Sequence, residues 1–227
     1  SQKMVEACQP WLAPGARVLD VGAGLGGTAF YIAQEVPDVF VHGVNVSSEM
    51  GSIVSGRHLS NSKHLRDRVS FDIAPEYGIP EHELRYPANC FDVVFIRETM
   101  MYLETQDKSV LLQKIWPMLR PGGCIVVVDY CLARPPSEIP ADLRSYLARW
   151  AYCLIEPQLQ EALIGRYFSV ETQDLTSEFI SFLDEGLQRI EEEFGTNSPE
   201  MKVPFGEAEV DALRGPLQDI VKQHLPT

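Results

Sequence analysis

Short apolar runs alternate with amphipathic stretches along the first 130 residues of the chain. Five runs have the length of buried strands, namely 16–21, 39–46, 69–73, 91–96 and 124–130. Helical spacing of apolar residues is found over 4–12, 26–36, 47–60 and 107–119. Regular alternation of strands and helices is typical of α/β proteins. The pattern therefore predicts an α/β fold with a doubly wound, mostly parallel sheet.

The pattern changes after Tyr130, at the end of the fifth predicted strand. A proline-rich segment follows over 132–140, and helices are predicted over 141–152, 156–167, 177–194 and 207–224. A sixth strand is predicted over 168–175. We expect one domain over 1–227, with a helical insertion after the fifth strand and a helical cap over the substrate at about 132–155 and 177–224. The abrupt start of the first helix favours a piece of a longer chain.

A glycine-rich segment, residues 20–27, joins the first strand to the following helix. Glycine lets the backbone approach a ligand and adopt positive φ, and open α/β sheets bind ligands at the carboxyl ends of their strands. The spacing Gly22-x-Gly24-x-x-Gly27 fits the dinucleotide fingerprint. The spacing Asp20-x-Gly22-x-Gly24-x-Gly26 resembles the first motif of class I S-adenosylmethionine (SAM) methyltransferases. A tight turn that binds no ligand is a third interpretation, so the glycines alone do not decide.

Features elsewhere in the chain favour SAM over a nicotinamide cofactor. The run Phe91-Asp92-Val93-Val94 resembles the fourth-strand motif FDxV of class I methyltransferases. The run 119–123 (LRPGG) resembles the turn before their fifth strand, and the spacing between the motifs is normal for the class. This resemblance implies a Rossmann-like fold with SAM as cofactor. Within it, Asp20 helps orient the methionine part of SAM, and Gly22, Gly24 and Gly26 line the cofactor.

The second strand ends on Asn45, where this class usually has Asp or Glu bonded to both ribose hydroxyls. An amide oxygen still accepts hydrogen bonds but lacks charge assistance, so we expect a loss of roughly 1 kcal/mol in affinity. The adenine ring is expected to meet Asp72 or Glu76, although either also fits a solvated loop charge. The complete expected cofactor set is Asp20, Gly22, Gly24, Gly26, Asn45, Val46, Asp72 and Arg97.

Charge and cysteine content narrow the function further. The formal net charge of -13 argues against a nucleic-acid backbone or an anionic membrane as partner, because both need clustered Lys and Arg. A small amine remains a suitable substrate. Five cysteines are scattered without a CxxC pair, which is typical of reduced thiols in the cytoplasm, and we expect no metal site. No apolar run reaches membrane-spanning length.

Over residues 15–180 the chain is similar to the phosphoethanolamine N-methyltransferases. The similarity rests on residues 19–27, on the Gly43-to-Ser47 turn, on Arg97-Glu98 after the fourth strand and on Asp129-Tyr130-Cys131 after the fifth. It implies successive methylation of phosphoethanolamine towards phosphocholine, a step of phospholipid biosynthesis.

The match to this family is partial at the substrate site. The family has Arg-Asp-x-x-x-His after its fourth strand, whereas this chain has Arg97, Glu98 and, in place of the histidine, Tyr102. Glu98 keeps the carboxylate that helps bind the amine. Tyr102 cannot act as a base near neutral pH, because the reference pKa of tyrosine is about 10. The residues expected to act in catalysis are Glu98, Tyr102 and Tyr130.

Tyrosines that contact the substrate in the family match Tyr130, Tyr146 and Tyr152, and the family's arginine falls on Trp150, beside Arg149. A phosphomonoester favours Arg or Lys, whereas aromatic faces and a carboxylate suit an ammonium. Tyr146 and Trp150, four residues apart, also fit a core stripe on a helix. The expected substrate-binding residues are Tyr130, Tyr146, Arg149 and Tyr152.

We therefore predict a cytoplasmic SAM-dependent N-methyltransferase for a small amine, phosphoethanolamine or its methylated forms. One alternative is a catalytically silent methyltransferase-like domain of a two-domain protein, and a second is a methyltransferase for another small molecule. A nicotinamide-dependent oxidoreductase is the third. The expected partners are the small-molecule amine and a second methyltransferase domain in the same chain, with neither nucleic acid nor membrane.

Overall fold

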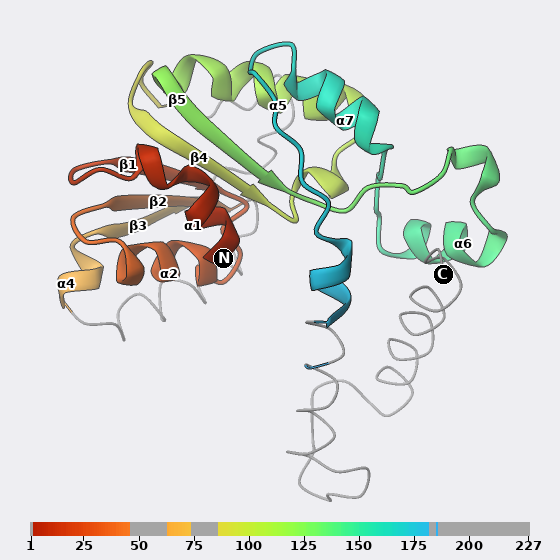
Figure 1. Ribbon diagram of the computed structural model, residues 1–227, viewed down its shortest axis with the longest axis horizontal. Coiled ribbons are helices and arrows are strands. Elements are labelled where there is room, and N and C mark those ends of the chain that lie inside the picture. The colour runs from red at the N-terminus through yellow and green to blue at the C-terminus, as the bar shows by residue number, and fades with distance from the viewer. Residues whose placement is uncertain (1, 46–62, 74–85, 182–184, 186–227) are drawn as a thin grey trace, which may run out of the picture. The chain divides into compact units, whose positions relative to one another are not determined.

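The computed structural model describes residues 2–45, 63–73, 86–181 and 185 (Figure 1). Five parallel strands form one sheet in the order β3-β2-β1-β4-β5. They are β1 (Arg17–Val21), β2 (Phe40–Asn45), β3 (Val69–Ile73), β4 (Phe91–Arg97) and β5 (Leu119–Val128). This sheet confirms the predicted doubly wound α/β fold, because the strand order reverses direction between β1 and β4.

The chain divides into two compact units, residues 1–139 with 149–170, and residues 140–148 with 171–227. Helices of the first unit are α1 (Gln2–Cys8), α2 (Gly27–Glu35), α4 (Lys63–Arg66), α5 (Thr105–Ile115) and α7 (Pro157–Ile164). Its short 3-10 turns are η1 (Gln9–Trp11), η2 (Met100–Tyr102), η3 (Trp116–Met118) and η4 (Pro136–Glu138). All of α6 (Ala141–Arg149) except its last residue belongs to the second unit, as does a helical segment at residues 176–181.

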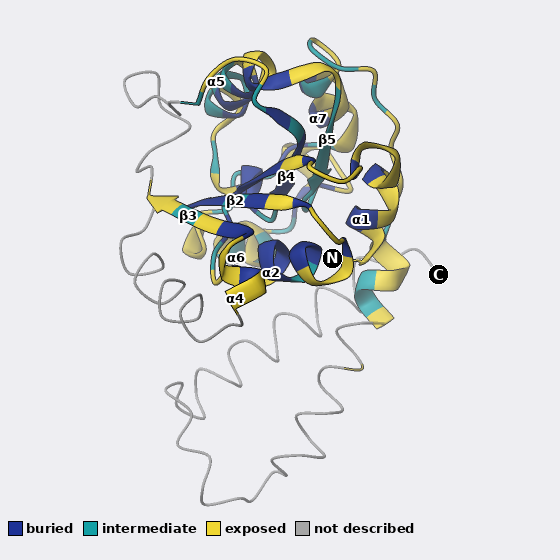
Figure 2. Ribbon diagram, turned by 90° about the vertical axis from the view of Figure 1, so that its left-hand side faces the viewer, coloured by how far each residue is buried: buried dark blue, intermediate teal, exposed yellow. Residues whose placement is uncertain are grey.

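Helices cover both faces of the sheet (Figure 1). Side chains alternate between the two faces of each strand. On β1, Val18 therefore packs with α1, α2 and α4, whereas Leu19 packs with α5 and α7. Both side chains are fully buried, as expected for a central parallel strand covered on both faces. Figure 2 shows the same contrast across the sheet, with the central strands buried and β3 largely exposed.

The FDxV and LRPGG motifs meet at the start of β4 and β5, on the side of the sheet away from the strand carboxyl ends. The Asp92 carboxylate accepts hydrogen bonds from the Arg17 backbone N–H at 2.7 Å and from Arg120 Nη1 at 2.6 Å. A Cβ atom at Gly123 would lie 2.9 Å from the carbonyl oxygens of Asp92 and Arg120. These contacts give both motifs a structural role in joining β1, β4 and β5.

The helix predicted over 107–119 ends earlier in the structure. Helix α5 ends at Ile115, η3 follows, and β5 already begins at Leu119. Gly122 has φ +78° and lies inside β5, where the pairing shifts register between Phe91↔Leu119 and Val93↔Cys124. Pro117 accounts for the earlier end, since proline cannot continue the helical hydrogen-bond pattern.

Two further predictions after β5 are wrong. Residues 168–175 form no strand in the described part of the chain. Phe168 instead continues the turn after α7 through a hydrogen bond from its backbone N–H to Ile164, and its ring packs edge-on against Trp116. Helix α6 ends at Arg149, so Tyr152 is not on that helix. The helices predicted over 47–60 and 207–224 lie outside the described residues, as does most of the one predicted over 177–194.

Arg68, which sequence reasoning did not single out, holds the carboxyl end of α2. Its guanidinium is buried and donates to the backbone carbonyls of Ala33 at 2.6 Å and Val36 at 3.2 Å. It also lies 2.9 Å from His64 Nε2. The last carbonyls of a helix have no partner within the helix, so a buried cation there satisfies groups that would otherwise be left unpaired.

Among the described residues, no helix is long and apolar enough to cross a bilayer.

Replacing Arg68 with methionine tests this role. Methionine keeps much of the apolar stem but leaves the Ala33 and Val36 carbonyls without their donor, so we expect the free energy of unfolding to fall by roughly 2–4 kcal/mol. Urea denaturation followed by circular dichroism measures the change. Arg66→Met is the matched control, because Arg66 is exposed, and it should change stability by less than about 0.5 kcal/mol. Equal effects of the two substitutions would contradict the assignment.

Candidate functional site

The candidate site lies where β1, β2, β4 and β5 end. In a parallel sheet these carboxyl ends share one edge, and the strand order reverses between β1 and β4, which is the place where open α/β sheets bind ligands. The glycine loop follows β1, Glu98 follows β4, and Asp129 and Tyr130 follow β5. The fold thus brings together segments that are far apart in the sequence.

The glycine loop has a backbone conformation that would be strained for residues with a Cβ atom. Gly22, Gly24 and Gly26 have φ values of +78°, +53° and +76°. A Cβ atom on Gly22 would also overlap the side chain of Thr99. Thr99 is buried, and its hydroxyl donates to Arg97 O at 2.9 Å. The turn after β4 is therefore packed directly against the loop after β1.

Asp20 is a buried acid beneath this loop. Its side chain is 2% exposed, and Oδ2 has no hydrogen-bond partner among the described residues. Burial raises the pKa of Asp20 to about 7, against the opposing influence of the Arg97 guanidinium and of a backbone hydrogen bond with Ala29. An unpartnered buried carboxylate oxygen costs free energy unless a donor or cation binds it. It therefore suits a ligand that carries an ammonium group, as the methionine part of SAM does.

Asn45 faces the loop from the end of β2. Its Oδ1 accepts the Gly24 backbone N–H at 2.6 Å, and its Nδ2 donates to the Gly24 carbonyl at 2.9 Å. Only 3% of the residue is exposed. Asn45, the residue expected to bind the ribose, is thus hydrogen-bonded to a residue of the protein itself.

Asp72, the expected adenine residue, contacts the side chain of His42 on the neighbouring strand β2. One carboxylate oxygen lies 3.2 Å from His42 Nε2, and the same His42 nitrogen lies 2.8 Å from the Tyr86 hydroxyl. The Asp72 side chain is 62% exposed. Val46 and Glu76 lie outside the described residues, so their roles stay predictions.

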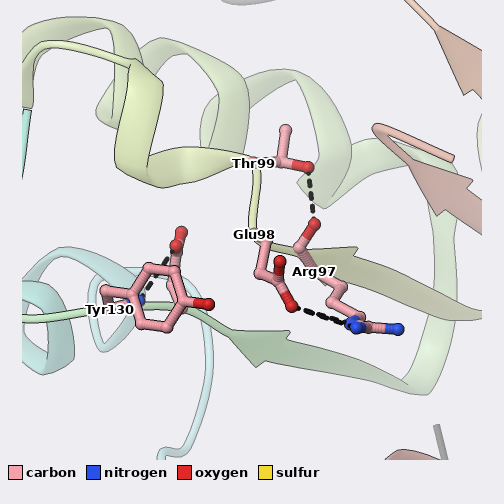
Figure 3. Close-up of polar contacts among 5 residues, drawn as sticks. Arg97, Glu98, Thr99 and Tyr130 are labelled. Carbon is pink, nitrogen blue, oxygen red and sulfur yellow. Dashed lines mark hydrogen bonds and ion pairs between the residues drawn. The ribbon is translucent and has the colours of Figure 1, made fainter. Parts of the chain in front are cut away.

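The Arg97-Glu98 pair ends β4 (Figure 3). Glu98 Oε1 accepts from Arg97 Nε at 3.1 Å and from Nη2 at 3.0 Å, and both side chains are partly exposed. Glu98 has φ +49°, which is strained for a residue with a Cβ atom. Strain of this kind concentrates at functional sites, and here it accompanies the turn that carries the carboxylate to the edge of the sheet.

Tyr130 lies opposite this pair, with its hydroxyl directed towards Glu98 (Figure 3). Burial raises the pKa of Tyr130 to about 12, and the nearby Glu98 carboxylate adds to the effect. The phenol is therefore neutral at physiological pH and can donate a hydrogen bond. Its backbone N–H donates to Asp129 Oδ1 at 3.1 Å, while Asp129 Oδ2 accepts the Met101 N–H at 2.9 Å. Asp129 thus ties the end of β5 to η2.

Tyr102 and Tyr152 form a pair at the rim of the site. Their ring centroids are 5.4 Å apart at an interplanar angle of 54°, and Tyr102 is half exposed. The backbone beside Tyr152 is fixed, because the Cys153 N–H donates to the Met101 carbonyl at 2.6 Å. The structure therefore places two of the predicted tyrosines in contact although they are far apart in the sequence.

Lys108 is a buried cation that sequence reasoning missed. Its ammonium donates to the Leu103 carbonyl and, at 2.6 Å, to the Cys153 carbonyl, so it holds η2 and the Tyr152 segment together. Burial lowers the pKa of Lys108, against the opposing influence of Asp129. A signal was present in the sequence, since Lys108 shares the buried face of α5 with Leu111, Leu112 and Ile115.

Two predicted substrate residues lie on α6. Arg149 is its last residue, and Tyr146 belongs to the second unit, so the roles of both stay predictions. All five cysteines are free thiols, and no group of three His, Cys, Asp or Glu side chains in the described ranges could hold a metal ion.

The sequence of this chain is similar to those of known methyltransferases. Residues 12–185 match the family model described as a methyltransferase domain. The chain is 34% identical over 184 residues to phosphoethanolamine N-methyltransferase 1 of Arabidopsis thaliana, a match that covers 80% of this chain and 35% of the plant protein. It is 28% identical over 140 residues to phosphoethanolamine N-methyltransferase of Plasmodium falciparum, covering 62% of this chain and 48% of that protein. The chain therefore spans between about a third and half of the length of these curated relatives.

A solved structure has the same fold. The phosphoethanolamine N-methyltransferase 2 of Haemonchus contortus, in complex with phosphomonomethylethanolamine and S-adenosylhomocysteine, superposes with a TM-score of 0.79 at 24% identity. The superposition covers 96% of this chain and 49% of the worm chain. It shows that the sheet and its helices have the architecture of a class I methyltransferase.

The buried acid predicts a specific dependence of stability on pH. The pKa of Asp20 is about 7 in the folded protein and near 3.9 when unfolded, so the unfolded state loses its proton first and folding stability falls as pH rises between these values. Asp20→Asn removes this dependence. We expect the stability of the variant relative to wild type to rise by roughly 1.4 kcal/mol per pH unit from about pH 4.5 and to level off near pH 7.

Urea denaturation of the two proteins across pH 4.5–8.5 measures this difference. Asp129, whose pKa burial raises to about 6, is present in both proteins and cancels in the comparison. A stability difference that is flat across the range would show that Asp20 keeps its ordinary pKa.

Proposed function

Because the chain belongs to the methyltransferase-domain family, we propose that it transfers the methyl group of SAM to the nitrogen of a small amine, phosphoethanolamine or its N-methylated forms. The observation that carries this proposal is the pair of carboxylates at the carboxyl ends of β1 and β4. Asp20 is buried, with one oxygen that has no hydrogen-bond partner in the part of the chain that the structure describes, and Glu98 is partly exposed beside Tyr130. The first suits the ammonium of a cofactor, and the second suits the ammonium of a substrate.

On the cofactor side, the residues present fit SAM. Asp20 Oδ2 would accept from the α-ammonium of the methionine part, and the positive φ values of the glycine loop let the backbone pass close to the ligand. The Arg97 guanidinium is close enough to Asp20 to lower the pKa of that acid, and it would face the α-carboxylate. The bound cofactor would supply a methyl group on a sulfonium centre, which is electrophilic without further activation.

On the acceptor side, the protein would bind the amine and align its lone pair with the methyl group. Alignment is the main requirement of a direct displacement, and the attacking nitrogen must first lose a proton. Glu98 would hold the ammonium and take up that proton. The neutral Tyr130 phenol would donate to the substrate, and the rings of Tyr102 and Tyr152 would offer their faces to the cation.

The phosphate group of the substrate needs binding residues of its own. A phosphomonoester is best bound by arginine, and the family arginine falls on Trp150 here. Arg149 would supply the missing charge from the adjacent position at the end of α6. We further propose that about 132–155 and 177–224 cap the substrate within one methyltransferase domain.

The cellular compartment of the reaction and the presence of a further domain are also proposals. The five free thiols suit the cytoplasm, where thiols stay reduced. We also propose a second methyltransferase domain in the same chain. The curated relatives are long enough to hold one, since the match covers only 35% of the plant protein.

A second candidate function is a catalytically silent methyltransferase-like domain. It is favoured by the ion pair that Glu98 forms with Arg97, which occupies the proposed amine-binding carboxylate. Such a domain would bind SAM without transferring its methyl group.

Methyl transfer itself is the first test. The protein is incubated with methyl-labelled SAM and with ethanolamine, phosphoethanolamine, its mono- and dimethyl forms, or glycine. We expect label on the phosphobases, and we expect Glu98→Gln to lower kcat/KM for them by about 10–100-fold because a charged hydrogen bond to the amine is lost. Glu35→Gln is the matched control, since Glu35 is exposed at the end of α2 and should leave the rate unchanged.

Label on ethanolamine alone would contradict the phosphobase assignment and favour a site that lacks phosphate recognition. SAM binding without transfer to any amine would favour the silent domain. Neither binding nor transfer would contradict the proposed function as a whole.

The glycine loop supplies a second prediction. Gly24→Val places a β-branched residue at φ +53°, so we expect SAM affinity to fall at least about 100-fold. Gly27→Ala is the matched control, because Gly27 lies in α2 without a positive φ and an added Cβ there meets no atom within 4 Å. Isothermal titration calorimetry with SAM measures the affinities of both variants. Normal binding by Gly24→Val would show that the cofactor lies elsewhere.

A further inference from the structure

The end of β2 holds the backbone of the glycine loop at three successive residues. The N–H groups of Gly22 and Ala23 both donate to the Val44 carbonyl, at 2.9 Å and 3.1 Å. The next N–H group, of Gly24, donates to the side chain of Asn45. The loop that follows β1 is therefore shaped by hydrogen bonds from the neighbouring strand.

Asn45 binds Gly24 through both halves of its amide. Oδ1 accepts the Gly24 N–H at 2.6 Å, while Nδ2 donates to the Gly24 carbonyl at 2.9 Å. An amide presents a donor and an acceptor side by side, so it can satisfy both backbone groups of one residue. An ionised carboxylate has only acceptors. It would keep the bond to the N–H but would set a negative oxygen against the Gly24 carbonyl oxygen.

Because Asn45 is buried, the difference between an amide and a carboxylate at this position matters. Asn45 is 3% exposed, so water cannot easily replace a partner that is lost. Gly24 has φ +53°, a conformation that an unrestrained glycine adopts no more readily than several others. The two hydrogen bonds from Asn45 therefore select one backbone conformation for Gly24.

We propose that Asn45 is a positioning residue, which fixes the glycine loop in its binding conformation through Gly24 and does not bind the ribose. This inference rests on the proposed function in that the ligand is SAM. It reverses the expectation from the class, in which an acid at this position would strengthen binding.

Amide hydrogen exchange in the ligand-free protein tests the bond itself. In Asn45→Ala, the Gly24 amide should exchange at least tenfold faster, because its acceptor is gone. The amides of Gly22 and Ala23 should keep their protection, since the Val44 carbonyl remains. NMR on isotope-labelled protein resolves the three amides. Unchanged protection of Gly24, or equal loss at all three amides, would overturn the proposal.

Ligand binding tests the functional consequence. Calorimetry compares wild type and Asn45→Asp with two ligands, S-adenosylhomocysteine and its 2′,3′-dideoxy analogue. We expect Asn45→Asp to weaken both ligands by the same factor, at least tenfold, because the substitution acts through the loop. Equal or tighter binding by the variant would overturn the proposal. A loss confined to the ligand with ribose hydroxyls would also overturn it, by showing direct contact with the ribose.

The pH dependence of this loss is an additional readout. Protonation gives the introduced carboxyl a donor, so the affinity of Asn45→Asp should recover relative to wild type as pH falls from 8 to 5. Asn89→Asp is the matched control, since it adds the same charge at an exposed residue. Failure of wild type to bind S-adenosylhomocysteine would count against the proposed function, whereas the exchange experiment would still decide the role of Asn45.

Discussion

The parallel pairing of β1 with β4 is the constraint on which the site depends. Val18, Leu19, Asp20 and Val21 pair in register with residues 93–96 of β4, so both strands end at the same level. The loop after β1 and the turn after β4 then meet so closely that a Cβ atom at Gly22 would overlap Thr99. The expected cofactor loop and the acid expected to bind the amine are therefore held next to each other by backbone pairing in the centre of the sheet.

Buried charges give this edge its chemical character. Removing a charge from water is costly unless a partner compensates for it, and each buried charge here has a different solution. Lys108 finds backbone carbonyls, Asp129 accepts two backbone N–H groups, and Asp20 keeps one oxygen without a partner among the described residues. Lys108 therefore joins η2 to the segment around Tyr152, and Asp129 joins η2 to the end of β5. The third is the group for which a bound cation would make the largest energetic difference, which is why the proposed cofactor site centres on it.

The repeated elements of the fold could be predicted from the sequence, whereas the connections after β5 could not. Strands β1 to β4 and helix α2 follow from apolar periodicity, because burial on both faces or on one stripe leaves a regular pattern. Residues 168–175 have the composition of a strand, but Phe168 packs on Trp116 instead of entering the sheet. Helix α5 ends before the glycines because of Pro117, and α6 ends before Tyr152. In each case tertiary packing or a local turn overrode a plausible pattern.

The sequence by itself determined the order of strands and helices as far as β5 and the positions at which the backbone needs glycine, because both depend on local periodicity and sterics. It also identified Asp20, Glu98 and Tyr130 as residues at strand ends. Only the tertiary structure decided what these residues contact. The bonds of Asn45 to Gly24, and of Lys108 to Cys153, join distant segments whose register no local pattern encodes. Hydrogen bonds between remote elements depend on distances of a few tenths of an ångström, and the packing of the whole sheet sets those distances.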